Sequence, residues 1–245
     1  MSTVKVCVIT GYGINADSEL VEAFRLCGAG VDLVHVSDLI ANPGTLHTYA
    51  IIGFPGGFSF GDHLGSGLVF ANLFKQNLKN QLAEFVAAGG LIIGICNGFQ
   101  VLVKMGVLPN LDGRWTQCVS LIHNESGLFI DRWVEVEAKK ESRCVWTAGI
   151  DRLDLPVRHG EGRFISASRE ILEKLKKEKL IALTYTRLNP NGSQEDVAGI
   201  TDPTGRILGL MPHPEAYLTR ENHPVWKEGN ALQIFRNGVE ASGRR

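Results

Sequence analysis

The sequence predicts an α/β fold, with a mostly parallel central sheet, helices on both faces of that sheet and a small antiparallel addition. Two observations support this prediction. Short apolar runs alternate with segments of helical spacing through the first half of the chain. Strands buried on both faces of a parallel sheet are continuous apolar runs, and strand–helix alternation is typical of this class. The later part of the chain instead alternates apolar and polar residues.

The first half contains the predicted parallel strands and the helices that join them. We expect the strands at Val4–Thr10, Val31–Val36, Tyr49–Phe54 and Leu91–Ile95. The first helix is expected at Ala16–Cys27, because Leu20, Phe24 and Cys27 recur at helical spacing before a glycine pair. A longer helix ends at Gly89–Gly90 and has four apolar residues on one face: Leu78, Leu82, Phe85 and Val86.

The second half contains the predicted antiparallel strands. Cys118–Ile122 and Trp133–Glu137 alternate as half-exposed strands do, and Thr201–Gly205 is expected to close a hairpin between Val197–Ile200 and Ile207–Leu210. The lysine-rich segment Glu173–Lys179 is interpreted as a solvated helix end. Since no linker or repeat interrupts the chain, residues 1–245 are predicted to form a single domain.

Composition excludes several classes of protein. Of the 245 residues, 44% are hydrophobic and 21% charged, and the net charge of -1 offers no basic surplus for nucleic acid. No apolar run approaches the ~20 residues of a membrane span, and the start lacks a secretory signal. The five cysteines are widely spaced, which argues against disulfides and zinc. We expect a cytoplasmic protein with no metal or cofactor.

Cys96 is the predicted nucleophile. The apolar strand ending at Ile95 runs directly into Gly94-Ile95-Cys96-Asn97-Gly98, a cysteine version of the nucleophile elbow. The glycines on either side are expected because side chains there would collide with neighbouring backbone. The turn also puts Cys96 at the N-terminus of a helix that continues through Phe99–Val103, where the helix dipole favours a thiolate.

His213 is the predicted base, with Glu215 as its partner. A thiolate that attacks an amide needs a proton shuttle, and that shuttle needs a group to orient it. Pro212 and Pro214 flank His213 and are expected to keep the segment extended. In an extended chain the side chains of residues i and i+2 point the same way, so His213 and Glu215 would lie side by side.

A third segment, Pro55-Gly56-Gly57-Phe58, follows a predicted strand and is expected to supply the oxyanion hole. Amide attack creates an oxyanion that backbone N–H groups must meet. A glycine turn exposes such groups without side chains in the way. We assign this role to the N–H groups of Gly57 and Asn97.

A dinucleotide-binding site is the first alternative. Gly11-Tyr12-Gly13-Ile14-Asn15-Ala16 follows a strand, opens a helix and precedes Asp38, as in the fingerprint of nicotinamide dehydrogenases. However, Asp17 and Glu19 fall in the first turn of that helix and would repel a pyrophosphate. Asp17 or Asn15 is better interpreted as a helix cap.

The three segments, in this order, resemble the class I glutamine amidotransferases, which have a flavodoxin-like fold. The closer resemblance is to the glutaminase subunits of phosphoribosylformylglycinamidine synthase. It extends over nearly the whole chain and rests on the segments already described, together with Gly13–Asp17, Ser59–Asp62, Pro156–Phe164 and Asn191–Ser193. Of these, His159-Gly160-Glu161-Gly162 is the most specific.

The resemblance implies both a reaction and a set of partners. Cys96 would attack the amide of L-glutamine, with Gly56, Phe58 and Gln100 binding the substrate, and water would hydrolyse the γ-glutamyl thioester. The ammonia would pass to a synthetase subunit that uses ATP and Mg²⁺ to convert formylglycinamide ribonucleotide to its amidine. A small third subunit can join this complex. His159 and Glu161 are expected at the interface or along the ammonia channel.

Two details separate the chain from the small stand-alone members of that family. His63–Gly67 lacks their arginine, and together with His123–Phe129 it resembles the long, fused form of the enzyme. These differences leave open which kind of synthetase subunit the chain docks on and whether a small third subunit is needed. Three alternatives also stay open beside the purine assignment: a glutaminase for another ATP-dependent synthetase, a cysteine peptidase or hydrolase, and a regulatory pseudo-amidotransferase. The retained Cys96 and His213 argue against the last.

Overall fold

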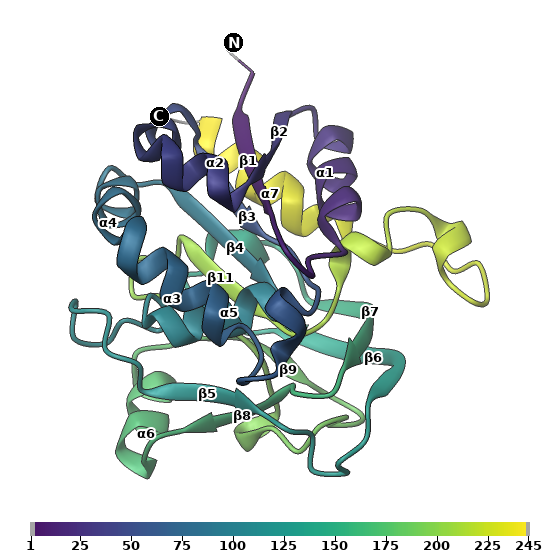
Figure 1. Ribbon diagram of the computed structural model, residues 1–245. Coiled ribbons are helices and arrows are strands. Elements are labelled where there is room, and N and C mark those ends of the chain that lie inside the picture. The colour runs from purple at the N-terminus through teal and green to yellow at the C-terminus, as the bar shows by residue number, and fades with distance from the viewer. Residues whose placement is uncertain (1–2, 244–245) are drawn as a thin grey trace.

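The computed structural model describes residues 3–243, which form a nine-stranded sheet with helices on both faces (Figure 1). Five neighbouring strands are parallel, and four antiparallel strands extend the sheet on one side. In spatial order the strands are β2 (Gly30–His35), β1 (Lys5–Thr10), β3 (Ile51–Phe54), β4 (Leu91–Ile95), β11 (Ile207–Leu210), β10 (Val197–Thr201), β9 (Ile181–Tyr185), β6 (Ile130–Ala138) and β7 (Arg152–His159). A separate pair, β5 (Val119–Ile122) and β8 (Arg163–Ser166), is antiparallel.

The apolar strands of the parallel half are buried on both faces of the sheet. Every residue of β3, β4 and β11 is buried, because helices cover both faces of the sheet. Helix α1 (Asp17–Leu26) packs with α7 (Leu232–Gly243), whereas α3 (Leu68–Asn77) packs with α5 (Asn97–Met105) on the opposite face (Figure 1). The predicted fold class is therefore confirmed.

The long helix predicted to end at Gly89–Gly90 is two helices. The chain bends at Leu78 (φ −128°, ψ 4°), which is the single residue between the end of α3 at Asn77 and the start of α4 (Lys79–Ala87). The bend leaves Leu78, like Leu82 and Phe85, buried in the core. The two remaining α-helices are α2 (Val36–Ala41) and α6 (Arg169–Lys177).

The hairpin predicted around Thr201–Gly205 is confirmed. Strand β10 pairs with β11 in antiparallel register, with Gly199 opposite Leu210. The Asp202 carboxylate fills the turn and accepts hydrogen bonds from the N–H groups of Thr204, Arg206 and Ile207. The turn fixes the register of β11, and β11 leads into the segment that contains His213.

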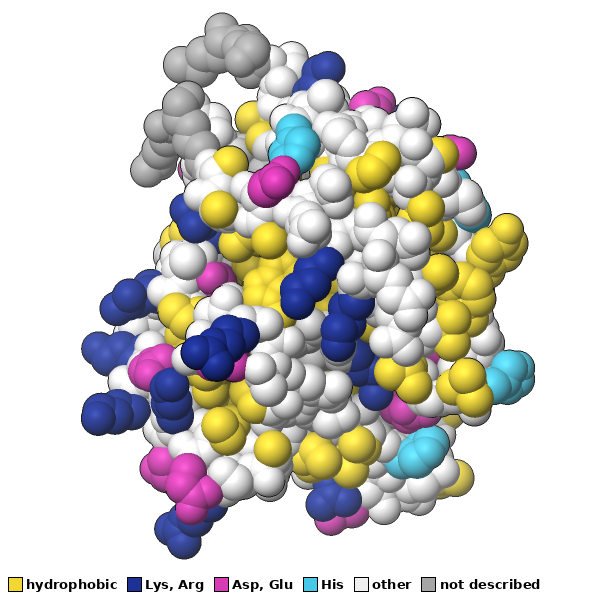
Figure 2. Space-filling view, turned by 60° about the vertical axis from the view of Figure 1, so that its left-hand side comes forward, with side chains coloured by type: hydrophobic (Ala, Val, Ile, Leu, Met, Phe, Trp, Pro, Cys, Tyr) yellow, Lys and Arg dark blue, Asp and Glu magenta, His cyan; other side chains and the backbone are white. Residues whose placement is uncertain are grey.

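Charged side chains are interspersed over the surface. Figure 2 shows one face on which basic, acidic and apolar side chains lie side by side. On α6, Lys174 pairs with Glu178 and Lys176 with Glu173, which confirms that this lysine-rich segment is a solvated helix. No helix between residues 3 and 243 is long and apolar enough to cross a membrane.

Candidate functional site

Cys96 lies on a strained turn between β4 and α5. Its backbone angles (φ 51°, ψ −105°) are rare for a residue with a side chain. A Cβ on Gly98 would lie 2.0 Å from the Phe54 carbonyl oxygen, and one on Gly94 would lie 2.8 Å from the carbonyl group of Gly98. Only glycine fits at either position. The predicted elbow and its glycine requirement are therefore confirmed.

The other cysteines have different surroundings. All five thiols are free. Burial raises the pKa of Cys7 to about 12 and that of Cys27 to about 11, which keeps both thiols protonated and unreactive. Cys144 is also buried, whereas Cys27 and Cys118 are half-buried. Of the five, only Cys96 lies beside a histidine–carboxylate pair.

His213 and Glu215 lie directly beside each other. The Nδ1 atom of His213 is 2.6 Å from Oε1 of Glu215, and both side chains are almost fully buried. The predicted contact is confirmed, but the extended backbone predicted for it is wrong. Pro214–Ala216 forms a 3₁₀ turn, because Pro214 enters the first position of a helical turn as readily as an extended segment. The N–H of His213 donates to Pro156 of β7 and anchors the turn.

The surroundings of His213 shift its pKa. Burial alone would lower its pKa, but the Glu215 carboxylate and the neighbouring Cys96 outweigh burial and hold the pKa of His213 well above its usual range. Within residues 3–243 the Nε2 atom of His213 has no hydrogen-bond partner, and neither does Oε2 of Glu215. Nε2 is therefore available for the Cys96 sulfur or for a substrate.

The predicted oxyanion-hole turn lies against the glycine-rich loop that follows β1. Gly57 pairs with Ile14 in a β-bridge, and the N–H of Phe58 donates to the Gly13 carbonyl oxygen over 2.8 Å. A Cβ on Gly13 would lie 2.1 Å from the carbonyl oxygen of Phe58. The loop is therefore filled by the protein's own backbone, which argues against the dinucleotide alternative.

Two N–H groups remain for an oxyanion. In the part of the chain that the structure describes, neither Gly57 N–H nor Asn97 N–H donates a hydrogen bond to another protein atom. Asn97 is the first residue of α5, where the N–H has no partner within the helix. The helix-cap interpretation at α1 is wrong: its N-cap is Ala16, without a side-chain cap, since the Asp17 carboxylate binds Thr10 and Ser18 instead.

Cys96, His213 and Gly57 line a pocket of about 220 Å³ at the carboxyl ends of the parallel strands, whereas Asn97 and Glu215 are not among its described lining residues. In open α/β sheets, ligands bind at these ends. The pocket is lined by Asn15, Glu19, Gly57, Phe58, Cys96, Phe129, Arg158 and His213. Of the residues predicted to bind substrate, Phe58 lines it, together with the predicted oxyanion donor Gly57, whereas Gly56 packs against the His213 ring. Gln100 is not among the described lining residues, and its side chain instead contacts Asn97 and Glu161.

Glu19 and Arg158 are pocket residues that sequence reasoning did not assign. An Nη2 atom of Arg158 lies 3.3 Å from Oε1 of Glu19, and both side chains are more than a third exposed. The pair presents one cation and one anion beside Cys96. The position of Glu19 in the first turn of α1 indicates only that a phosphate is disfavoured there. Nothing in the sequence indicates that Arg158, 139 residues away, is its partner.

His159 is buried and forms hydrogen bonds with Asn124. Its Nδ1 atom lies 3.0 Å from Oδ1 of Asn124, and the Asn124 side-chain amide donates to the His159 carbonyl oxygen over 2.8 Å. Burial and the nearby His213 lower the pKa of His159 to about 4, so the ring is neutral at neutral pH. Glu161 is partly exposed, 3.9 Å from the exposed His123.

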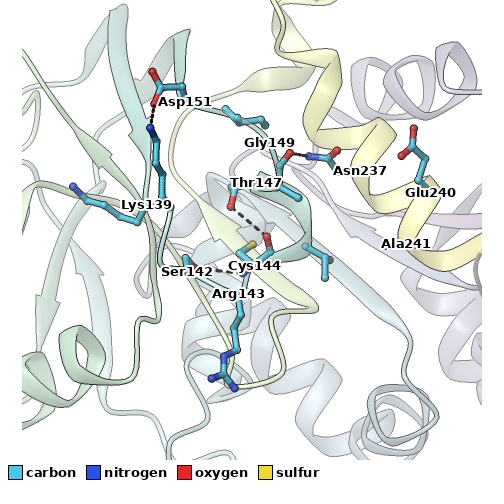
Figure 3. Close-up of a pocket in the computed structure, with 14 residues that line it drawn as sticks. Lys139, Ser142, Arg143, Cys144, Thr147, Gly149, Asp151, Asn237, Glu240 and Ala241 are labelled. Carbon is cyan, nitrogen blue, oxygen red and sulfur yellow. Dashed lines mark hydrogen bonds and ion pairs between the residues drawn. The ribbon is translucent and has the colours of Figure 1, made fainter.

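A second, larger cavity of about 650 Å³ lies between α7 and the segment 139–151 (Figure 3). None of its lining residues belongs to the pocket at Cys96. Both lysines of its lining form ion pairs: Lys139 with Glu137, and Lys140 with Asp151. The Arg143 side chain points away from the cavity (Figure 3).

Comparisons with known proteins identify relatives along nearly the whole chain. Residues 3–240 match the family described as a CobB/CobQ-like glutamine amidotransferase domain. The chain is 43% identical over 267 residues to a protein of Methanococcus maripaludis named phosphoribosylformylglycinamidine synthase subunit PurQ, covering 96% of both chains. A protein of the same name from Dehalococcoides mccartyi is 43% identical over 258 residues, with 98% of both chains covered.

Solved structures are also similar, and one of them matches along nearly the whole chain. It is described as the structure of PurLQS from Thermotoga maritima, and its matching chain is 27% identical with a TM-score of 0.76. The match covers 98% of this chain and 99% of that one. The sequence relatives are named as separate subunits, although two segments of this chain resemble the fused form of the enzyme.

Proposed function

The chain belongs to the family of glutamine amidotransferase subunits of phosphoribosylformylglycinamidine synthase, and from this premise we propose that Cys96, His213 and Glu215 carry out its glutamine hydrolysis. One observation supports these roles above all. A cysteine on a strained elbow shares a pocket with a histidine whose Nδ1 atom is held by a buried carboxylate and whose Nε2 atom is unpartnered among the described residues.

The reaction follows from this geometry. The Cys96 sulfur attacks the side-chain amide carbon of glutamine, and the carbonyl oxygen becomes an oxyanion that the N–H groups of Gly57 and Asn97 stabilise. When the carbon–nitrogen bond breaks, the protonated His213 gives its proton to the departing ammonia. His213, now neutral, takes a proton from water, which attacks the γ-glutamyl thioester. Glutamate leaves, and the thiolate and the protonated His213 are restored.

The charged pair at the pocket accounts for the choice of a free amino acid. Glutamine has an α-ammonium and an α-carboxylate in addition to its reactive amide. Glu19 can bind the ammonium and Arg158 the carboxylate, while the amide lies at Cys96. Charge-assisted hydrogen bonds of this type contribute about 1.5–3 kcal/mol each. This assignment distinguishes glutamine from a glutamine residue inside a peptide, whose α-groups are neutral amides, and so argues against the peptidase alternative.

Replacing Arg158 by methionine tests the assignment. Methionine keeps the apolar stem but removes the charge, so we expect KM for glutamine to rise about 10- to 100-fold with a smaller change in kcat. Steady-state glutaminase kinetics measure both constants. Arg152→Met is the matched control, because Arg152 lies on the same strand and pairs with Glu135 outside the pocket. An unchanged KM in Arg158→Met would rule out the carboxylate site.

The ammonia passes to a separate synthetase subunit, which uses ATP and Mg²⁺ to convert formylglycinamide ribonucleotide to formylglycinamidine ribonucleotide. Exposed apolar side chains of Phe58, Leu64, Leu128 and Phe129 lie on loops around the pocket and the Glu161 turn, and they provide a docking surface for that subunit. His159 and Glu161 lie in the same region. We place the complex, with a small third subunit, in the cytoplasm.

An isotope experiment tests this delivery. Glutamine labelled with ¹⁵N in its amide is supplied to the chain with the synthetase subunit, the ribonucleotide and ATP, in an excess of unlabelled ammonium. We expect most of the amidine formed to contain ¹⁵N, because ammonia released into solution would be diluted. Cys96→Ala should form only unlabelled amidine. Glutamine hydrolysis by the wild type without any ¹⁵N in the amidine would indicate that the chain serves another synthetase.

A further inference from the structure

Two aromatic side chains form one side of the pocket at Cys96. Phe58 follows the glycine turn after β3, and Phe129 directly precedes β6. Their ring centroids are 6.3 Å apart and their planes are tilted by 33°, within the range of an attractive aromatic pair. Both residues line the pocket, and yet their side chains are 46% and 54% exposed. The pair therefore lies at the mouth, where the pocket meets solvent.

Both rings are attached to backbone that is itself held in place. The N–H of Phe58 donates to the carbonyl oxygen of Gly13 over 2.8 Å. The carbonyl oxygen of the residue before Phe129 accepts from the Asn124 side chain over 2.9 Å. A Cβ on Gly160 would lie 3.8 Å from the Phe129 ring, so that ring rests on the turn after β7. The two rings thus meet because two distant loops are fixed on either side of the pocket.

The other exposed residues of the pocket are polar. They are Asn15 and the ion pair of Glu19 with Arg158. In the function proposed above, Glu19 and Arg158 bind the α-ammonium and the α-carboxylate of glutamine. A bound glutamyl group then occupies the charged part of the mouth. The aromatic part is left as the route by which a second reactant reaches the thioester on Cys96.

The thioester can react with more than one nucleophile. Water attacks its carbonyl carbon, the carbon–sulfur bond breaks, and His213 takes the proton that water loses. A primary amine reacts in the same way: its nitrogen bonds to the carbon, the thiolate leaves, and His213 takes a proton from the nitrogen. The product is then a γ-glutamylamide instead of glutamate. Clean hydrolysis therefore depends on keeping larger nucleophiles away from the thioester.

We propose that Phe58 and Phe129 determine the selectivity of this second step, by admitting water to the γ-glutamyl thioester and excluding larger amines. The inference rests on the function proposed above. Two rings in contact block an amine, whereas the rapid rotamer motion of exposed side chains opens enough space for a water molecule. Neither ring transfers a proton or stabilises charge, so both act through size alone.

The test measures products instead of rates. Glutamine is supplied together with hydroxylamine, methylamine or propylamine at about pH 9, where part of each amine is unprotonated. Glutamate and the γ-glutamyl product are quantified by mass spectrometry, for the chain alone and with the synthetase subunit. Water and amine attack the same thioester with the same base and the same oxyanion donors. The ratio of the two products therefore reports access to the thioester, whichever step limits kcat.

Phe129→Ala is the principal variant, because it removes one exposed ring and leaves the glycine turn at Phe58 intact. Leu128→Ala is the matched control for the ratio: Leu128 is the adjacent residue, is 66% exposed and is not among the described lining residues. Phe129→Tyr keeps the ring and serves as the conservative variant. Phe129→Val, a smaller truncation, takes the place of Phe129→Ala if that variant does not turn glutamine over.

We expect Phe129→Ala to raise the ratio of γ-glutamylpropylamide to glutamate at least about tenfold, because pocket selectivity of this size is typical for one or two methylene groups. The ratio for hydroxylamine, which is nearly as small as water, should stay within about twofold of the wild type. Leu128→Ala and Phe129→Tyr should keep the wild-type ratios.

An unchanged propylamide ratio in Phe129→Ala, or an equal rise in Leu128→Ala, would overturn the inference. The same two criteria apply to Phe129→Val where it is used. A wild type that forms neither glutamate nor any γ-glutamyl product, alone and with the synthetase subunit, would instead refute the proposed function itself.

Discussion

Replacing Cys96 by alanine should lower glutamine hydrolysis by about 10⁴-fold or more, to the background of the assay. No other described thiol lies beside a histidine–carboxylate pair, and the remaining groups of the pocket are donors and charges that cannot form the thioester. Glutamate formation by the wild type and the variant, each alone and with the synthetase subunit, measures the effect.

Cys118→Ala is the matched control. Cys118 is half-buried and lies just before β5, outside the pocket, so its loss should leave glutamine turnover unchanged. Turnover retained in Cys96→Ala would show that the nucleophile is elsewhere. If the wild type is also inactive with and without the synthetase subunit, the chain is better explained as a regulatory pseudo-amidotransferase.

Replacing Glu215 by glutamine should lower kcat by about 10²- to 10⁴-fold. The carboxylate holds Nδ1 of His213 at 2.6 Å and raises the pKa of the imidazole. Glutamine offers a neutral oxygen or an N–H in its place, so the charged imidazole is less favoured and its tautomer is no longer fixed. His213 would then be protonated over a narrower range of pH.

The pH dependence of kcat/KM is a separate test of the role of Glu215. In the wild type, the raised pKa keeps His213 protonated at neutral pH and moves the loss of its proton to high pH. Without the Glu215 charge that pKa falls, so the upper limb of the kcat/KM profile should move to lower pH. Asp154→Asn is the control, since Asp154 also pairs with a histidine, His223, but outside the pocket. An unshifted upper limb would contradict the role of Glu215.

The features that sequence could predict are those encoded locally. The elbow at Cys96 needs glycine two residues before and after it, and a strand and a helix on either side, all within a few positions. The contact between His213 and Glu215 was predictable from their spacing, although the turn at Pro214–Ala216 was not. Proline fits both an extended segment and the start of a helical turn, so the pattern could not separate them.

The features that sequence could not predict depend on contacts between distant segments. The approach of His213 to Cys96 follows from the parallel pairing of β11 with β4. The pair of Glu19 and Arg158 joins α1 to β7 across the pocket. The position of Gln100 likewise depends on the Glu161 turn, 61 residues away. Residue type and spacing contain no signal for such pairs.

The most direct test of Cys96 as the nucleophile is to trap the covalent intermediate. The chain is mixed with glutamine in the presence of the synthetase subunit, quenched in acid within the first turnovers, digested and examined by mass spectrometry. If Cys96 is the nucleophile, the peptide that contains it should have a glutamyl group, which is absent from Cys96→Ala and is removed by hydroxylamine, as expected of a thioester. A glutamyl group on another residue, or glutamine turnover that gives no adduct on Cys96 at any quench time, would contradict it.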